Sequence, residues 1–311
     1  MGSTLLAILA TTTPFFAVVA AGWWAARRGW VGPGAVGGLN AFVLDFALPA
    51  MLLRFGMTLP LAELLHPGVL LVYALAGTAL LLAVVAWARR RMGRVDAAFA
   101  ALIAVFPNSG FMGLPLLAAL LGPASAGPVV SSIAIDMVLT TSLALALGQH
   151  GGARRALSGA ARNPLAWAIV IGAALGASGT QLPVPVRATI DLLAAAASPV
   201  ALFMIGTVLH HAGRGGAAAE ARPVPVWPLV VVKLVAHPAA VALAGWAALR
   251  GGWIGAAQWT ALVLVAALPS ASNVAMLAHR LGAGAALVPR VIMATTVVAF
   301  ATFALWAWGV G

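Results

Sequence analysis

Cysteine is absent from this chain, and charged residues are scarce. Without cysteine the protein cannot form disulfides, use a thiol in catalysis or bind a metal through thiolates. Charged residues account for 7% of the 311 residues, whereas 63% are hydrophobic and the mean hydropathy is +1.06. A soluble domain does not need so much apolar surface, and runs of about 20 apolar residues recur along the chain. The composition therefore predicts an all-α polytopic membrane protein.

The residue patterns of enzymes are also missing. No pair of catalytic carboxylates and no H-E-x-x-H pattern appears, and nothing resembles a P-loop, so ATP use is not implied. Residues 32–37 fit a dinucleotide glycine fingerprint by letter, but no strand precedes them. His210 and His211 are adjacent and cannot share one helix face, which argues against a metal site. We expect a protein that is not an enzyme and that needs neither a cofactor nor a metal.

Hydropathy and loop residues together predict ten membrane-spanning segments, five in each half of the chain. They are expected at residues 5–26, 38–57, 67–88, 97–120 and 126–147, and at residues 164–180, 188–209, 226–249, 256–279 and 287–308. They are called spans 1 to 10 in chain order.

The arginines gather in the loops on one side of the predicted membrane. Loops after the odd-numbered spans hold thirteen of them, and the opposite side holds Arg54, Arg187 and Arg250. Cytoplasmic loops carry the excess of positive charge, so both termini are predicted to lie outside the cytoplasm. This topological role accounts for the net charge of +11, and no nucleic-acid partner is expected. Arginine in place of lysine, with abundant alanine and glycine, indicates a GC-rich bacterial genome and hence the bacterial inner membrane.

Proline and asparagine interrupt one span in each half. Span 4 contains Pro107 and Asn108, and span 9 contains Pro269 and Asn273. Proline removes a backbone donor and clashes with the preceding turn, so both spans should break inside the bilayer. Broken backbone at membrane depth survives only where it is buried in protein or lines a cavity. A matching pair of interruptions is the best sequence indication of a secondary transporter's binding site.

The two halves share several residues in the same order. Pro14, Gly22, Pro49 and Gly56 recur 150 residues later as Pro164, Gly172, Pro199 and Gly206. Because each half has five spans, the second half enters the membrane from the opposite side, so the repeat must be inverted. We predict a first five-helix repeat at residues 1–148, a cytoplasmic linker at 149–163 and a second, inverted repeat at 164–311.

Several stretches resemble the auxin efflux carrier family, in the bacterial branch that includes malonate-type transporters. They are Trp24–Val31, Ala47–Pro49, Arg162–Leu165, Ser198–Leu202 and, most specifically, Pro107-Asn108 followed by Met112–Leu117. The resemblance covers nearly the whole chain. It implies ten helices in two inverted five-helix repeats, in which broken helices 4 and 9 cross near the midplane and bind an anionic substrate. It also implies that spans 1, 2, 6 and 7 form a scaffold with a possible homodimer contact, while the other spans carry the site.

Substrate-binding residues are predicted around the two interruptions. The candidates are Asn108, Ser109, Gly113, Pro115 and Asn273, and the predicted hinges of the crossing are Pro107, Pro115 and Pro269. An asparagine amide can donate to a carboxylate, and the free N-terminus of a broken helix adds roughly half a positive charge. Alternatively, each amide only satisfies backbone groups freed by proline, and both roles can coexist.

Four ionisable residues inside the spans are candidates for ion coupling. They are Asp45 in span 2, Asp136 in span 5, and Lys233 and His237 in span 8. Intramembrane ionisable residues are functional candidates by default, and a carboxyl that takes up and releases a proton suits a coupling site. The alternatives are structural: a partner for a cation or helix end in the case of the aspartates, a structural or gating ion pair for Lys233, and a packed neutral ring for His237.

These features predict a secondary active transporter of a small organic anion, such as a mono- or dicarboxylate, driven by a proton gradient or by the membrane potential. A sodium-coupled bile-acid-type carrier is an alternative that would share the crossed broken helices. A channel or sensory membrane protein is another alternative. The expected partners are the substrate and membrane lipid.

Overall fold

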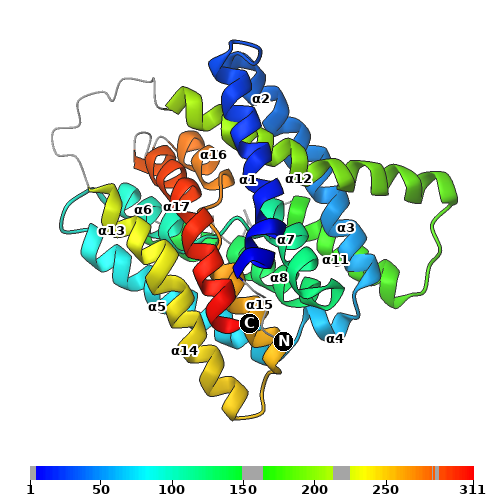
Figure 1. Ribbon diagram of the computed structural model, residues 1–311. Coiled ribbons are helices and arrows are strands. Elements are labelled where there is room, and N and C mark those ends of the chain that lie inside the picture. The colour runs from blue at the N-terminus through cyan, green and yellow to red at the C-terminus, as the bar shows by residue number, and fades with distance from the viewer. Residues whose placement is uncertain (1–4, 149–163, 213–224, 282, 284–286) are drawn as a thin grey trace.

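Helices form the membrane-embedded body of this protein. The computed structural model in Figure 1 describes residues 5–148, 164–212, 225–281, 283 and 287–311. Within these ranges all regular structure is helical, apart from an isolated antiparallel β-bridge between Pro107 and Ser270. Seven helical segments among the described residues are long and apolar enough to cross a membrane. The chain is therefore a multi-pass helical membrane protein, as its composition predicted.

The first half of the chain contains the following helices. They are α1 (Leu5–Arg27), α2 (Pro33–Phe42), the π-helical segment η1 (Val43–Ala47), α3 (Leu48–Thr58), α4 (Leu61–Leu64), α5 (Pro67–Ala88), α6 (Arg94–Val105), π-helical η2 (Ser109–Gly113), α7 (Leu114–Leu121), the 3₁₀ turn η3 (Pro123–Ser125), α8 (Ala126–Ile135), π-helical η4 (Asp136–Thr140) and α9 (Thr141–Gly148).

The second half contains a similar series. It consists of α11 (Pro164–Ala177), α12 (Val184–Ala212), α13 (Val226–Val231), π-helical η5 (Val232–Ala236), α14 (His237–Arg250), α15 (Ala256–Ala267), α16 (Asn273–Arg280) and α17 (Leu287–Val310).

Spans 1, 2, 3, 5, 7, 8 and 10 correspond to the seven long apolar segments. Span 6 corresponds to α11, which has only 14 residues. The other two predicted spans are interrupted, because α6 ends at Val105 and α15 ends at Ala267. The chain thus breaks just before Pro107 and Pro269, where proline was expected to end each helix.

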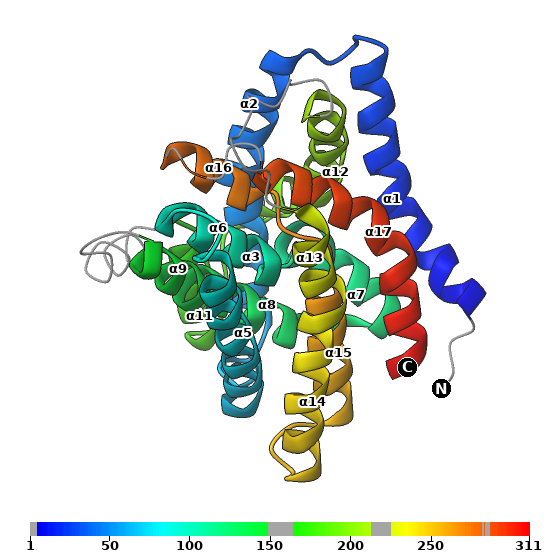
Figure 2. The same cartoon turned by 90° about the vertical axis from the view of Figure 1, so that its left-hand side faces the viewer.

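The two helices that lead to these breaks lie in the core. Every residue of α6 from Ala97 to Val105 is buried, and so is every residue of α15 from Ala261 to Ala267. A helix that is apolar on all sides belongs in a protein interior. Figure 2 shows α15 running beside α14, and the other neighbours of these helices include α5 and α17.

Two other pairs of helices pack backbone against backbone. Helix α1 lies along α12, where a Cβ atom on Gly22 would fall 1.9 Å from the carbonyl oxygen of Phe203, and one on Gly206 would fall 1.9 Å from the carbonyl oxygen of Val19. Helix α3 lies along α11, where a Cβ on Gly172 would fall 2.4 Å from a backbone oxygen of α3. Only glycine allows two backbones to approach this closely in a membrane.

Candidate functional site

The two interrupted segments meet in the core and pair through their backbones. The amide of Asn108 donates to the carbonyl oxygen of Pro269 at 2.8 Å, and the amide of Ala271 donates to the carbonyl oxygen of Phe106 at 3.0 Å. Buried backbone groups must find hydrogen-bond partners, and a broken helix leaves several without one. Each break therefore supplies partners for the other, and the interruptions predicted from proline and asparagine lie against each other.

A side chain also satisfies a carbonyl near the C-terminal end of each helix that leads to a break. The hydroxyl of Ser270 donates to the carbonyl oxygen of Ile103 in α6 at 2.8 Å. The ammonium of Lys233 donates to the carbonyl oxygen of Ala266 in α15 at 2.6 Å. The last carbonyls of a helix lack intrahelical partners and carry partial negative charge. A neutral hydroxyl therefore serves the end of α6, and a buried cation serves the end of α15.

A small cavity, about 20 Å³ in volume, lies at the crossing. Its polar lining comprises Asn108, Ser109, Asp136 and Asn273. The hydroxyl of Ser109 and the side-chain oxygen of Asn273 are buried and have no hydrogen-bond partner within the described part of the chain. Buried polar atoms are nearly always paired, so these two atoms require an explanation, and a role in binding is one. In this conformation the cavity has room for about one water molecule.

Asp136 joins the cavity to a buried polar network. Both carboxylate oxygens accept hydrogen bonds: Oδ2 from the Tyr73 hydroxyl at 2.9 Å, and Oδ1 from the Thr140 hydroxyl at 3.2 Å. The rings of Tyr73 and His237 lie 6.0 Å apart, and Nζ of Lys233 is 3.4 Å from Nδ1 of His237. All five residues are buried. The network thus leads from the cavity to the ammonium that contacts α15.

The π-helical segments coincide with these candidate residues. Segment η2 begins at Ser109, η4 begins at Asp136, and η5 contains Lys233. A π-helical turn inserts an extra residue into a helix, and such turns occur frequently at functional sites. The fourth such segment, η1, contains Asp45, whose side chain is exposed on the surface and does not line the cavity.

The remaining predicted substrate-binding and hinge residues are divided between the cavity lining and its neighbourhood in the sequence. Pro107 lines the cavity, whereas Gly113, Pro115 and Pro269 do not. A Cβ atom on Gly113 would lie 2.8 Å from Cδ1 of Leu268, so this glycine allows the two interrupted segments to pack closely. Pro115 lies at the second position of α7, directly after the π-helical segment η2.

Three residues of the crossing and its polar network were not predicted from the sequence: Tyr73, Thr140 and Ser270. Tyr73 is the only tyrosine in the chain, and it lies in the middle of an apolar span. A single phenol in an apolar span is a signal in the sequence, because a buried tyrosine hydroxyl usually has a hydrogen-bond partner. The hydroxyls of Thr140 and Ser270 gave no such signal, because serine and threonine are common in membrane helices and usually bond to their own helix.

The chain matches one family model and is similar in sequence to several known proteins. The family model for membrane transport proteins matches residues 7–158 and 153–307. The chain is 29% identical over 309 residues to a Rhizobium meliloti protein named "Putative malonate transporter", and the match covers 95% of this chain and 93% of that protein. It is 28% identical to "Uncharacterized transporter YfdV" of Escherichia coli, over 86% of each chain. It is also 29% identical to an "Uncharacterized transporter" of Methanothermobacter thermautotrophicus, over 86% of this chain and 87% of the relative.

Proposed function

The chain belongs to the membrane transport protein family, that of the auxin efflux carriers, and we propose that it is a secondary active transporter of a small organic anion. Proteins of this family are membrane transporters and not enzymes. The observation that carries the proposal is the cavity at the paired interruptions, where two asparagines and a serine from both segments surround one space. Broken helices at the core of a transporter are where substrates bind.

The local polarity favours an anion. A continuous helical stretch, Ser109–Leu121, begins at the cavity, and α16 begins there at Asn273. The first N–H groups of a helix have no intrahelical partner, and the helix dipole places partial positive charge at this end. Two such ends, together with the side-chain amide of Asn108, offer donors to a carboxylate without a buried cation in the lining. The relative named for malonate supports a small dicarboxylate as the substrate class.

Asp136 is the proposed coupling residue. It lines the same cavity, so an ionised Asp136 and a substrate carboxylate would repel each other across a short distance. The substrate should therefore bind more readily when Asp136 carries a proton. The hydroxyls of Tyr73 and Thr140 can each donate or accept, so the site can satisfy the carboxyl in either protonation state. Other charged and titratable groups on this side of the cavity are Lys233 and His237, which complete the network.

Transport requires the crossing region to move, because the cavity is too small for any dicarboxylate in this conformation. We propose that spans 1, 2, 6 and 7 form a fixed scaffold and that the remaining spans carry the site past it. The glycine contacts support this division: α1 with α12 joins spans 1 and 7, and α3 with α11 joins spans 2 and 6. Within each of these two pairs, the helices pack backbone against backbone.

The same contacts support two inverted repeats of five helices, at 1–148 and 164–311. Span 6 is the counterpart of span 1 in the second repeat, and span 7 is the counterpart of span 2. The contact of span 1 with span 7 is therefore equivalent to that of span 6 with span 2, and both contacts use glycines that recur 150 residues apart in the sequence. The family model also matches the chain as two successive segments. Figures 1 and 2 show the start of α1 near the end of α17, as expected if both termini lie on one side of the membrane.

The proposal is tested by counterflow in proteoliposomes. Protein carrying Asn108→Ala should lose at least about ten-fold of its exchange of labelled malonate, because the amide that meets the substrate is gone. Asn40→Ala is the matched control, since Asn40 lies in α2 and does not line the cavity. Normal exchange by folded Asn108→Ala protein would remove the assignment. Saturable counterflow identifies a carrier and excludes a channel, and full activity without sodium excludes a sodium-coupled carrier.

A further inference from the structure

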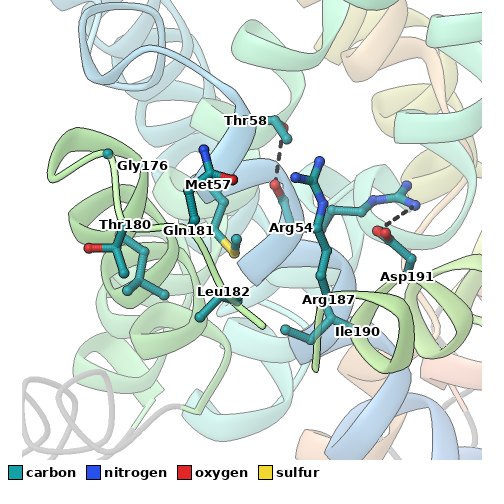
Figure 3. Close-up of a pocket in the computed structure, with 12 residues that line it drawn as sticks. Arg54, Met57, Thr58, Gly176, Thr180, Gln181, Leu182, Arg187, Ile190 and Asp191 are labelled. Atoms are coloured by element: carbon teal, nitrogen blue, oxygen red, sulfur yellow. Dashed lines mark hydrogen bonds and ion pairs between the residues drawn. The ribbon is translucent and has the colours of Figure 1, made fainter. Parts of the chain in front are cut away.

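A second pocket shares no lining residue with the cavity at the crossing and has a larger volume. It has a volume of about 190 Å³ and is formed by the end of α3, the end of α11, the loop that follows it and the first turns of α12 (Figure 3). Its polar lining includes Arg54, Gln181, Arg187 and Asp191. Two of the three arginines on the predicted outer side of the membrane therefore line one space. The pocket has room for several water molecules or for one small oxyanion.

The positive charge of this pocket is only partly neutralised. Arg54 is 3.8 Å from Asp191, and the two side chains are 37% and 45% exposed. Arg187 makes no ion pair within the described part of the chain, although Asp191 lies one helical turn away on α12. Figure 3 shows the Arg187 side chain extending beside that of Arg54. Two guanidiniums with one carboxylate between them leave a net charge of one positive unit in the pocket, and an anion would relieve the repulsion between the guanidiniums.

Some neutral donors of the pocket already form hydrogen bonds, and others do not. The hydroxyl of Thr58 donates to the carbonyl oxygen of Arg54 in its own helix at 3.0 Å. The hydroxyl of Thr180 is 2.6 Å from that of Ser178. The amide of Gln181 forms no side-chain hydrogen bond among the described residues. The uncommitted donors are therefore the Arg187 guanidinium and the Gln181 amide.

We propose that this pocket binds a carboxylate or phosphate group through Arg187 and Gln181. A guanidinium presents a planar fork that matches the two oxygens of a carboxylate or phosphate. Arg54 contributes positive charge from the wall of the pocket, and Asp191 limits the affinity by neutralising part of that charge. The oxyanion can come from a lipid headgroup or from a free anion in solution. The site is separate from the crossing and does not depend on the transport mechanism.

Binding of free anions is tested by thermal unfolding of purified protein in an uncharged detergent. Sodium phosphate is titrated at constant ionic strength, and sodium malonate is titrated in protein carrying Asn108→Ala, which removes the crossing site from the comparison. A ligand that binds only the folded state raises the unfolding temperature. Arg187→Gln should weaken binding at least about ten-fold, whereas Asp191→Asn should strengthen it because Arg54 is released. Arg250→Gln, an exposed arginine that stacks on Trp246, is the charge-matched control.

Lipid binding is tested by native mass spectrometry of protein released from bilayers of phosphatidylglycerol or phosphatidylcholine. Retained phosphatidylglycerol that is lost in Arg187→Gln and displaced by phosphate would identify a headgroup as the ligand. Anion binding without retained lipid would identify a free anion. The proposal would be overturned if wild type and Arg187→Gln bound every probe equally. It would also be overturned if the protein bound neither phosphate, malonate nor lipid.

Discussion

The glycine-packed helices and the interrupted helices bury their surfaces in different ways. Where α1 meets α12, an added Cβ atom on either glycine would fall 1.9 Å from a backbone oxygen, so no side chain separates the two helices. At the crossing, the contacts are made by side chains and by short backbone pairings around a cavity. Two buried polar atoms there, on Ser109 and Asn273, have no partner within the described residues.

This difference bears on the proposed movement of the crossing past the scaffold. Backbones packed in direct contact have one arrangement of lowest energy, because close-packed interiors deform little. Buried polar atoms without partners are rare, so those of Ser109 and Asn273 fit the proposal that the crossing binds a substrate. The glycine-packed helices therefore suit a scaffold, and the crossing suits a site that opens and closes. One hydrogen bond between the two regions is donated by the Ser198 hydroxyl of α12 to the carbonyl oxygen of Phe111.

The largest expected effect concerns the glycine-packed helices. Gly206→Ala should lower both the yield of folded protein and its unfolding temperature, because its Cβ atom would meet the carbonyl oxygen of Val19 at 1.9 Å and the amide nitrogen of Trp23 at 2.6 Å. Overpacking of this kind costs about 1–3 kcal/mol or more. The yield of monodisperse protein and its unfolding temperature measure the effect. Gly77→Ala in α5 is the control, since nothing lies within 4 Å of its added Cβ. An unfolding temperature equal to wild type for Gly206→Ala would contradict a rigid scaffold.

A cross-link between the two regions should abolish transport reversibly. A Cβ on Gly110 would lie 3.3 Å from Cδ1 of Leu48, so the two residues are neighbours, and a disulfide between cysteines placed there would join η2 to α3. The chain has no cysteine of its own, which makes the pair selective. Counterflow should stop on oxidation and return on reduction, and each single cysteine variant is a control for the substitution itself. Undiminished transport by fully cross-linked protein would show that the two regions do not move past each other.

Replacement of Asp136 should affect energy coupling more than exchange. Asp136→Asn keeps the shape of the side chain and removes its titration, so pH-driven accumulation of malonate should be lost while substrate-for-substrate exchange continues. Asp45→Asn, at an exposed carboxylate that does not line the cavity, is the matched control. The measurements are accumulation under an imposed pH gradient and counterflow without one. Accumulation at the wild-type level in folded Asp136→Asn protein would reject the coupling role.

The smallest expected effect is at the end of α6. Ser270→Ala leaves the carbonyl oxygen of Ile103 without its side-chain donor, which should reduce the free energy of unfolding by about 1–3 kcal/mol. Lys233→Met removes a charged donor at the end of α15 and should reduce it further, because hydrogen bonds to charged groups are stronger. Thermal unfolding compares the two variants. A larger loss for Ser270→Ala would mean that the cation contributes little to the end of α15.

Much of the fold could be predicted because its causes are local. Apolar runs define segments that cross a membrane, and Pro107 and Pro269 end the helices before them by removing donors. Asn108 and Asn273 were expected at the cavity for the same reason, since they adjoin the broken backbone. Asp45 and Asp136 were both coupling candidates from the sequence, because both are carboxylates inside spans, and the deeper position of Asp136 beside broken span 4 only slightly favoured it. The structure separates them clearly, since Asp45 is exposed and Asp136 is buried in the lining of the cavity.

The sequence by itself therefore determined that this chain is a helical membrane protein with two broken spans, because hydropathy and proline act on neighbouring residues. Tertiary structure alone decided what each polar side chain contacts. Tyr73 reaches Asp136 across 63 positions, and Ser270 reaches Ile103 across 167. Contacts of this range depend on how whole helices pack, and each is one of many pairings that the same apolar spans would allow. The chemistry of the site follows from those distant pairings.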